Sequence, residues 1–226
     1  MWTRAEVAKR IDHAVLKPAF TTRDLETHAA MCLRLGVGCL CVRPTDVAHA
    51  VRLLDGSSCI PAAVVGFPHG ISRPRVKALE TRLAIEDGAR EIDMVMNYGR
   101  FLSGDAAFVH RDIAMVVSEA KPFSVPVKVI LETCYLKPGQ IAEACLLARD
   151  AGADFVKTST GFAEGGATPE AVAVMLKTVG SSMRVKASGG IRTWEEAVMY
   201  LDMGCARLGV GSTEAVLSGG AGTGGY

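Results

Sequence analysis

The sequence predicts a single α/β domain folded as a (β/α)8 TIM barrel, and three observations indicate this fold class. Eight short apolar runs alternate with amphipathic stretches across 226 residues, a length typical of one such barrel. Several presumed helices end in a glycine that is followed at once by a presumed strand. The dipeptide Val-Lys begins at residues 127, 156 and 185, so it recurs every 29 residues, the length expected of one βα unit.

The expected strands are rich in β-branched residues, and their continuous apolar runs predict burial on both faces, which is typical of a parallel sheet. They cover residues 14–16, 39–42, 62–67, 92–97, 127–131, 155–159, 185–188 and 207–211. The clearest helical pattern has one apolar face, made up of Ile141, Ala144, Cys145 and Ala148. The glycines expected to give left-handed helix ends are Gly36, Gly88, Gly152 and Gly204.

Eight strands that alternate with helices fit either a doubly wound sheet or a barrel. The sequence has no early G-x-G-x-x-G to open a dinucleotide-binding half, and its polar residues sit late in strands along the chain. Active sites of barrels are built in this way, from the C-terminal ends of the strands. We therefore expect one barrel domain over residues 1–217, followed by a flexible, glycine-rich tail over residues 218–226.

Composition and charge argue against several function classes. Lys and Arg number 25 against 24 Asp and Glu, so the formal net charge of +1 gives no reason to expect nucleic acid or a membrane surface as a partner. The first ten residues lack the apolar core of a signal peptide, and no apolar run approaches the ~18 residues of a membrane span. The seven cysteines are irregularly spaced, so we expect reduced thiols, no metal site and a cytoplasmic protein.

Lysines in three successive expected strands give the first indication of chemistry. Side chains alternate along a strand, so Lys157 shares a face with Phe155 and Ser159, and Lys128 and Lys186 lie in the two flanking strands. Neighbouring strands are about 4.8 Å apart, so the three amines are expected to lie close together. A lysine in a buried strand is costly unless it is paired or used.

Two interpretations of these lysines remain open. Either they belong to an ion-paired core, with Asp93 and Glu132 as partners, or they form an active site. In an active site, neighbouring ammonium groups and burial both disfavour charge, so one amine is partly neutral near neutral pH and can attack a carbonyl. Lys157 lies on the middle strand with a cation on each side, which favours it as the nucleophile and Lys186 as the perturbing cation. Lys128 is equally consistent with a salt bridge deeper in the barrel.

Two aspartates are candidates for proton relay in imine and enamine chemistry. Asp93, within the segment E-I-D-M-V, is expected in the barrel mouth, where its carboxylate moves protons, neutralises one lysine, or does both. Asp12 lies just before the first expected strand, where an aspartate is usually solvated or caps a helix. It is a second candidate for the same relay.

Glycine-rich loops late in the chain indicate an anion site. Barrels commonly bind phosphate with the loops after strands seven and eight, through backbone N–H groups and a helix N-terminus. Glycine lets the backbone approach the ligand closely. The expected phosphate-binding residues are Gly161, Ser188, Gly189, Gly190, Gly211 and Ser212.

Three segments of the chain closely resemble the deoxyribose-phosphate aldolases. They are K-T-S-T-G-F at residues 157–162, V-K-A-S-G-G-I at 185–191 and E-I-D-M-V at 91–95, and the likeness runs from Ile11 to Ser212. The resemblance implies a class I aldolase barrel without metal or cofactor. It also implies a Schiff base between Lys157 and acetaldehyde, a pKa of Lys157 lowered by Lys186, and a proton relay through Asp93.

The implied reaction is the reversible cleavage of 2-deoxy-D-ribose 5-phosphate into D-glyceraldehyde 3-phosphate and acetaldehyde. We also expect Lys128 to be one of the substrate-binding residues. Some members of the family carry a lysine near the phosphate where this chain has Phe162, so backbone donors matter more here. Some members also end in a tyrosine that aids proton transfer, a role for which this chain offers Tyr226.

Three other functions compete with this one. A different class I aldolase or a transaldolase-like barrel would share the lysine of the sixth strand but take a larger sugar phosphate. A phosphate-binding barrel that works by enolisation needs no imine, and a non-enzymatic binding barrel gives the buried lysines no use. Barrels of this kind often pair through their outer helices, so a homodimer or higher homo-oligomer is an expected assembly.

Overall fold

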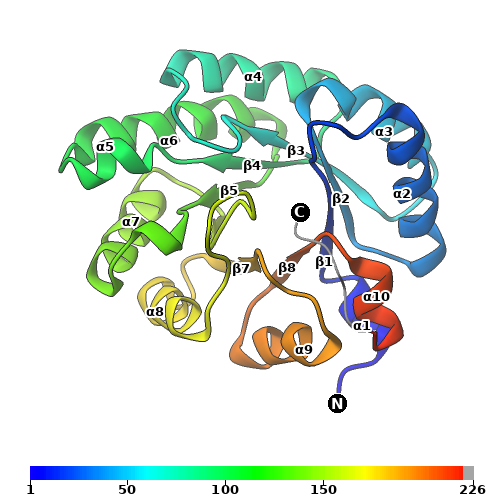
Figure 1. Ribbon diagram of the computed structural model, residues 1–226. Helices are drawn as coiled ribbons and strands as arrows, with labels where there is room; N and C mark the ends of the chain where they lie inside the picture. The colour runs from blue at the N-terminus through cyan, green and yellow to red at the C-terminus, as the bar shows by residue number, and fades with distance from the viewer. Residues whose placement is uncertain (221–226) are drawn as a thin grey trace.

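The computed structural model describes residues 1–220 and has eight parallel strands closed into one barrel, in the order β1 to β8. Figure 1 looks along the barrel, with the helices arranged around it. The strands are β1 (Ile11–Val15), β2 (Cys39–Val42), β3 (Ile60–Val65), β4 (Glu91–Val95), β5 (Val127–Ile130), β6 (Phe155–Lys157), β7 (Arg184–Ser188) and β8 (Arg207–Val210). The predicted fold class and number of strands are confirmed.

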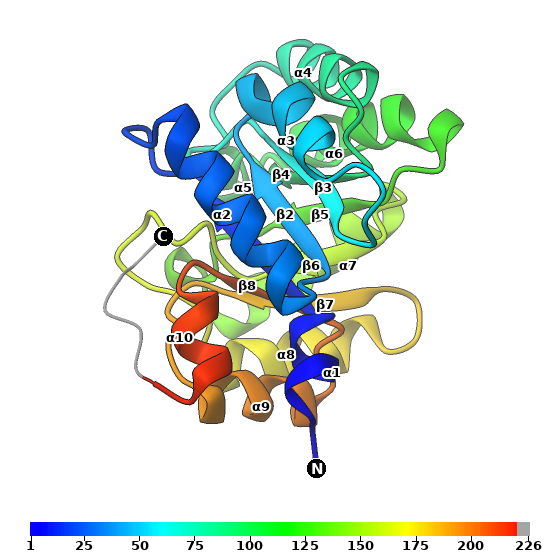
Figure 2. The same ribbon diagram turned by 90° about the vertical axis from the view of Figure 1, so that its right-hand side faces the viewer.

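The helices connect the strands and cover the outside of the barrel. Figure 2 views the barrel from the side and shows α2 lying over β1 and β2. The α-helices are α1 (Arg4–Ala8), α2 (Thr22–Leu35), α3 (Val47–Leu53), α4 (Pro74–Glu86), α5 (Tyr98–Leu102), α6 (Ala106–Ala120), α7 (Pro138–Asp150), α8 (Pro169–Val179), α9 (Trp194–Met203) and α10 (Thr213–Ser218). Three short 3-10 helices are η1 (Pro44–Asp46), η2 (Lys121–Phe123) and η3 (Thr133–Tyr135).

Most of the apolar core lies between the strands and the helices. The four residues predicted on the apolar face of α7 are all buried there. The four predicted helix-ending glycines all have positive φ, a conformation that other residues rarely adopt. Gly36 and Gly204 are themselves the C-caps of α2 and α9, whereas Gly88 and Gly152 follow the cap by one residue.

The barrel interior has an apolar half and a charged half. A separate apolar cluster fills the inside of β1, β2 and β3, and it consists of Ala14, Leu16, Cys39, Cys41, Ala62 and Val64. Charged residues of β4 to β8, apart from the exposed Arg184 at the start of β7, fill the rest of the interior together with Asp12 of β1, and each of them is at least largely buried. The charged groups are therefore removed from water, and they pair with one another inside the barrel.

The first strand begins earlier than the sequence indicated. β1 starts at Ile11, so Asp12 and His13 lie inside the strand, and the prediction that Asp12 precedes it is wrong. Both side chains are buried, because Asp12 pairs with cations inside the barrel and His13 hydrogen-bonds to His28 and Thr213 outside it. Asp12 and His13 are polar, so the apolar run from which the strand was predicted began only after them.

The predicted tail begins within the last helix. Ser218 is the final residue of α10, and the predicted flexibility from residue 221 onward falls outside the described residues. Among residues 1–220, no helix has both the length and the apolar character needed to cross a bilayer.

Candidate active site

Strand register brings the candidate lysines together. Lys157 on β6 lies opposite Lys186 on β7, and Asp93 on β4 lies opposite Lys128 on β5. Lys128 pairs with Phe155 of β6, so it lies two residues deeper in the barrel than Lys157. All of these charged side chains are at most 2 % exposed, and the three lysines converge on Asp93, which confirms that they point inward.

Asp93 is the centre of the charged cluster. Its Oδ2 accepts hydrogen bonds from Lys157 Nζ at 2.8 Å and from Lys186 Nζ at 2.7 Å. Its Oδ1 accepts from Lys128 Nζ at 2.6 Å. Asp12 accepts from Lys186 on one oxygen and from Arg207 Nη1, at 2.5 Å, on the other. The structure thus brings both aspartates predicted for the relay into contact with lysine.

Lys157 differs from the other two lysines in its pKa. Burial lowers the pKa of Lys157, Asp93 offsets part of this effect, and the ammonium of Lys186 lowers the pKa further. Burial also acts on Lys186, but Asp12 and Asp93 hold its pKa well above the ordinary value. Lys157 is therefore the amine of the pair that more readily loses its proton, and Lys186 keeps its charge.

The electrostatics of the aspartates follow from the same contacts. Burial alone would raise the pKa of Asp93, but Lys128, Lys157 and Lys186 hold it well below its usual range. The pKa of Asp12 is also lowered, because Lys186, Lys128 and Arg207 outweigh the effect of burial. Both groups are carboxylates near neutral pH, so each can accept a proton only when a neighbouring amine changes its charge.

The expectation that Lys157 has a cation on each side is wrong. Its partner in register on β5 is Ile130, and Lys128 lies deeper. Lys128 donates to Asp93 and lies 2.6 Å from Glu91 Oε2. Among the described residues it is thus an ion-paired group beneath the amine of Lys157, in agreement with the salt-bridge alternative.

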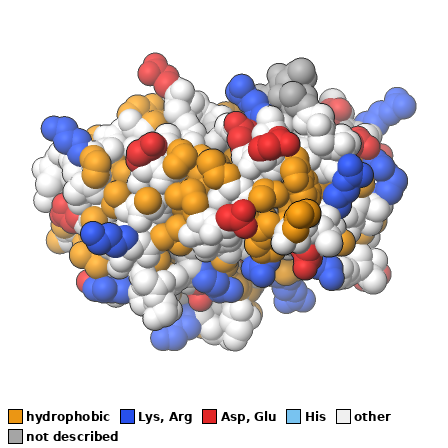
Figure 3. Space-filling view, turned by 90° about the horizontal axis from the view of Figure 1, so that it is seen from below, with side chains coloured by type: hydrophobic (Ala, Val, Ile, Leu, Met, Phe, Trp, Pro, Cys, Tyr) orange, Lys and Arg blue, Asp and Glu red, His pale blue; other side chains and the backbone are white. Residues whose placement is uncertain are grey.

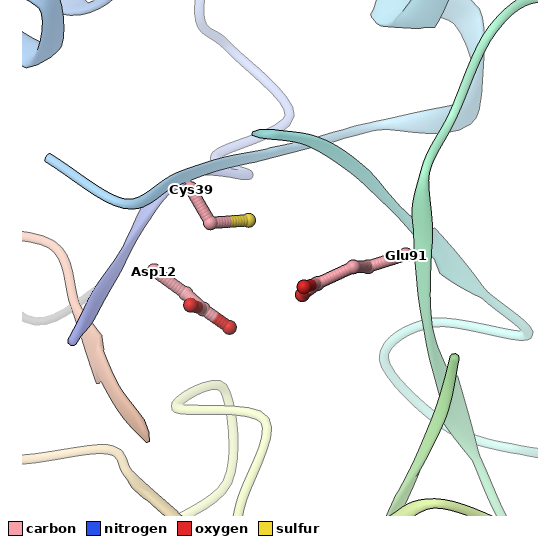
Figure 4. A group of neighbouring side chains, drawn as sticks. All are labelled: Asp12, Cys39 and Glu91. Carbon is pink, nitrogen blue, oxygen red and sulfur yellow. The ribbon is translucent and has the colours of Figure 1, made fainter. Parts of the chain in front are cut away.

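The deepest part of the cluster has the donors of a metal site but already contains cations. Asp12, Cys39 and Glu91 point toward one another, with ligand atoms within 4.8 Å (Figure 4). Lys128 and Arg207 both contact these carboxylates, and Arg207 Nη2 lies 2.6 Å from Glu91 Oε1. Burial and the nearby carboxylates raise the pKa of Cys39 well above its usual value, so the sulfur is a thiol and a poor ligand. The geometry fits an ion-pair cluster rather than a metal centre.

Glu132 shapes the loop after β6, and within residues 1–220 it forms no salt bridge with a lysine, although Lys157 is near enough to lower its pKa. Its described partners are the backbone N–H of Thr160, at 3.1 Å, and the Thr160 hydroxyl, at 2.5 Å. It has a φ of 56°, which is unusual for a residue other than glycine. Burial raises the pKa of Glu132, although its hydrogen bonds with Thr160 oppose this effect. It fixes the segment that follows Lys157.

The predicted phosphate loops after β6 and β7 pack against each other. Gly161, Gly189 and Gly190 all have φ between 81° and 86°. The carbonyl of Gly189 accepts a hydrogen bond from Ala167 N at 2.9 Å, and a Cβ on Gly189 would meet the loop after β6. Ser188 is fully buried, and its hydroxyl donates to the carbonyl of Ser159. The glycines therefore permit a close approach of the two loops, and the Ser188 hydroxyl holds them together.

The third predicted loop joins β8 to α10. Gly211 and Ser212 lie there and line a hollow of about 440 Å³ together with residues of α2 and α10. Thr213, the first residue of α10, is held by a 2.8 Å hydrogen bond with His13 Nδ1. Burial lowers the pKa of His13 to about 3, so this ring is neutral and the bond persists across the ordinary pH range.

Two phenylalanines meet above the barrel interior. Phe67 follows β3 and packs on the apolar interior cluster, whereas Phe162 follows β6 and is 37 % exposed. Their rings are 5.2 Å apart, edge to face. Because β4 and β5 separate β3 from β6 in the barrel, this contact bridges part of the mouth beside the apolar half of the interior.

The sequence interpretation missed the role of Arg207. This residue lies opposite Lys186 in register and ties Asp12 to Glu91. Alternation along β8 could have indicated its inward direction, because Arg207 lies on the same face of the strand as Gly209 and Gly211, which belong to the side expected to face the site. Tyr226, the remaining predicted catalytic residue, lies outside the described residues.

Comparison with known proteins agrees with this geometry. The model of the DeoC/LacD family of aldolases matches residues 6–210. The deoxyribose-phosphate aldolase of Methanothermobacter thermautotrophicus is 48% identical over 96% of this chain and 96% of its own length. A crystal structure of a putative deoxyribose-phosphate aldolase from Coccidioides immitis matches with a TM-score of 0.92 and 37% identity, over 96% of this chain and 86% of that one. The tetrameric deoxyribose phosphate aldolase from Aeropyrum pernix matches with a TM-score of 0.89 and 32% identity, over 96% and 91% of the two chains.

Proposed function

The chain belongs to the DeoC/LacD family of aldolases, and we propose that it cleaves 2-deoxy-D-ribose 5-phosphate through a Schiff base on Lys157. The products are D-glyceraldehyde 3-phosphate and acetaldehyde, and the reaction is reversible. The observation that carries this proposal is the buried pair of Lys157 and Lys186 on one oxygen of Asp93, in which only Lys157 has a lowered pKa.

The chemistry begins when neutral Lys157 attacks the aldehyde carbon of the open-chain sugar and water leaves. The protonated imine then accepts the electron pair of the breaking carbon–carbon bond and becomes an enamine, while the sugar hydroxyl at the new carbonyl loses its proton. Protonation of the enamine carbon regenerates an imine, and water releases acetaldehyde and the free amine. The apolar interior half beside Lys157 suits the methyl group of acetaldehyde.

Asp93, Lys186 and Asp12 support these proton transfers. The cation of Lys186 keeps Lys157 available as a free amine, and Asp93 contacts both nitrogen atoms. When the amine becomes a protonated imine, its nitrogen keeps one N–H that can still donate to Asp93, so the carboxylate stabilises the new charge beside a water molecule or substrate hydroxyl that exchanges protons. Asp12 holds Lys186 in position through its own contact.

The phosphate of the sugar binds to the loops after β6, β7 and β8. The support is their place at the C-terminal ends of the strands and the positive φ of Gly161, Gly189 and Gly190. Gly211 and Ser212, which directly follow β8 at the same end of the barrel, complete the proposed set. Ser188 contributes by holding two of these loops together, and Lys128 contributes by holding Asp93, so neither side chain needs to contact the substrate.

Reductive trapping tests the proposal. The protein is incubated with acetaldehyde and borohydride, and its peptides are analysed by mass spectrometry. We expect an N-ethyl group on Lys157, with Lys186 unmodified as the internal control. A Lys157→Arg variant that retains substantial cleavage activity would instead favour enolisation without an imine, since the charge survives this substitution. Trapping by a larger ketose but not by acetaldehyde would favour a transaldolase-like reaction.

The C-terminal residues and the assembly extend the proposal. Tyr226 assists proton transfer at the enamine carbon, and a Tyr226→Phe variant tests this through proton exchange of acetaldehyde in deuterated water.

The barrel domain is assigned to residues 1–217. The chain forms a homo-oligomer in the cytoplasm. Oligomerisation is supported by the tetrameric relative and by a groove of about 730 Å³ on α9, which is lined by four apolar residues and two acidic ones, Trp194, Val198, Met199, Met203, Glu195 and Asp202. Hydrophobic side chains gather on this face of the molecule (Figure 3).

A further inference from the structure

Four arginines line a groove of about 770 Å³ that does not include Lys157. Arg73 and Arg75 lie at the start of α4, Arg100 lies on α5 and Arg111 lies on α6. The connections from β3 to α4 and from β4 to α5 both lie at the C-terminal end of the barrel. The groove is therefore on the same end of the molecule as the candidate active site, at its outer edge.

The charge of the groove is concentrated and exposed. The ten residues that line it include four arginines, all exposed, and no carboxylate. The protein as a whole has a formal net charge of only +1, so this concentration is local. Within residues 1–220, the ion pair recorded for these arginines is a loose one, with Arg100 Nη1 3.6 Å from Asp105 Oδ2. Solvent-exposed like charges repel one another, and a bound anion would relieve that repulsion.

An aromatic ring supports the arginines on one side of the groove, and a helix N-terminus adds positive charge on the other. The ring of Phe108 lies 5.1 Å from the guanidinium of Arg100 and 5.5 Å from that of Arg111, so one aromatic ring supports both cations. Arg73 is the N-cap of α4, and its side chain makes no capping hydrogen bond there. The first turn of α4 has no acidic residue, so the positive end of this 13-residue helix adds to the charge.

We propose that this groove binds a small anion with two phosphoryl groups, one held by Arg73 and Arg75 and the other by Arg100 and Arg111. Guanidinium groups match phosphate in geometry and bind it through paired hydrogen bonds. A groove of about 770 Å³ is in the size range of small-molecule sites. The sugar substrate has a single phosphoryl group, so this site is distinct in both place and ligand from the proposed catalytic one.

Calorimetry with pyrophosphate, ATP and inorganic phosphate tests the site on the intact protein. We expect pyrophosphate and ATP each to bind more tightly than inorganic phosphate, because both present adjacent phosphoryl groups to the two arginine pairs. Each double variant, Arg73→Ala with Arg75→Ala or Arg100→Ala with Arg111→Ala, is expected to weaken pyrophosphate binding by about tenfold or more, since each loses charge-assisted hydrogen bonds.

The matched control replaces two exposed arginines elsewhere, Arg23→Ala on α2 with Arg52→Ala on α3, and so makes the same change in net charge. This variant should keep the affinity of the unaltered protein. Pyrophosphate binding that survives both groove variants, or that glyceraldehyde 3-phosphate displaces, overturns the proposal because the anion then occupies the catalytic phosphate loops. Failure of pyrophosphate and ATP to bind more tightly than phosphate also overturns it.

Discussion

Lys157 and Lys186 lie opposite each other in register, and both donate to the same oxygen of one carboxylate, Oδ2 of Asp93. Two ammonium groups on one oxygen repel each other, and burial increases the cost of both charges. Asp12 supports the charge of Lys186 from the other side. The proton is therefore lost more readily from Lys157, and the strand register itself determines which amine becomes the nucleophile.

Replacement of Lys186 by Met is expected to raise the pKa of Lys157. The neighbouring cation is lost, and Asp93 then interacts more strongly with the remaining ammonium. The acid-side limb of the kcat/KM profile should move to higher pH, and activity at neutral pH should fall by about 100-fold or more, as is usual when acid–base groups are lost. The measurement is the pH dependence of cleavage.

Lys186→Arg is the control for this prediction, because it keeps the positive charge. Its profile should retain an acid limb close to that of the unaltered enzyme even if the rate falls. A Lys186→Met enzyme that loses rate with an unchanged limb would show that Lys186 does not act through the pKa of Lys157.

Lys128→Met tests the deep part of the ion-pair cluster. Lys128 is fully buried and contacts Asp93 Oδ1 and Glu91 Oε2, so its removal leaves these two buried carboxylate oxygens without their nearest cation. We expect the free energy of unfolding at neutral pH to fall by about 3–5 kcal/mol, measured by urea denaturation. Arg82→Ala, in the exposed pair with Glu119, should cost only about 0–1 kcal/mol.

The same variant has an expected pH dependence. Asp93 has a lowered pKa in the folded protein, so its contribution to stability is present above the unfolded pKa and is lost as the pH falls through the folded one. In Lys128→Met that lowering is smaller, so less stability remains to be lost on acidification. The difference between the two proteins should therefore shrink at acid pH, and a constant difference would contradict an electrostatic role for Lys128.

The sequence predicts the barrel and the inward lysines because both depend on periodicity. Alternation along a strand determines the face of Lys157 and Lys186, and the 29-residue spacing reflects the βα unit. Asp12 was misplaced for a physical reason. A strand residue whose charge is neutralised by Lys186, 174 positions away, has a polar signature identical to that of a loop residue.

The role of Glu132 could not be predicted from the sequence either. Its φ of 56° is normally taken by glycine, and its partner Thr160 is 28 residues away. The sequence shows only a carboxylate in the phase of Lys128, which suggested an ion pair. Strained backbone that is held by long-range contacts leaves no periodic signal, and such positions cluster at functional sites.

Glu132 is expected to act by positioning the loop after β6. Glu132→Ala removes the acceptor for both donors of Thr160, so KM for the sugar phosphate should rise by about tenfold or more while the pH profile keeps its shape. Glu132→Gln keeps one acceptor and should stay within about threefold of the unaltered enzyme. If Glu132→Gln abolishes the acid or basic limb of the profile, the carboxyl group takes part in proton transfer instead.

Phe162 is expected to set how strongly the enzyme selects for phosphate. It follows Gly161 in the proposed phosphate loop and packs edge to face on Phe67, so it offers the substrate an apolar surface and no charge. Phe162→Lys should add a charge-assisted hydrogen bond to the phosphate and raise the preference for 2-deoxyribose 5-phosphate over 2-deoxyribose by about tenfold, measured as a ratio of kcat/KM. High salt should reduce this gain. Phe162→Met, which loses the ring without adding charge, should leave the ratio unchanged. An equal change for both sugars in the lysine variant would mean that Phe162 acts only by closing the barrel mouth with Phe67.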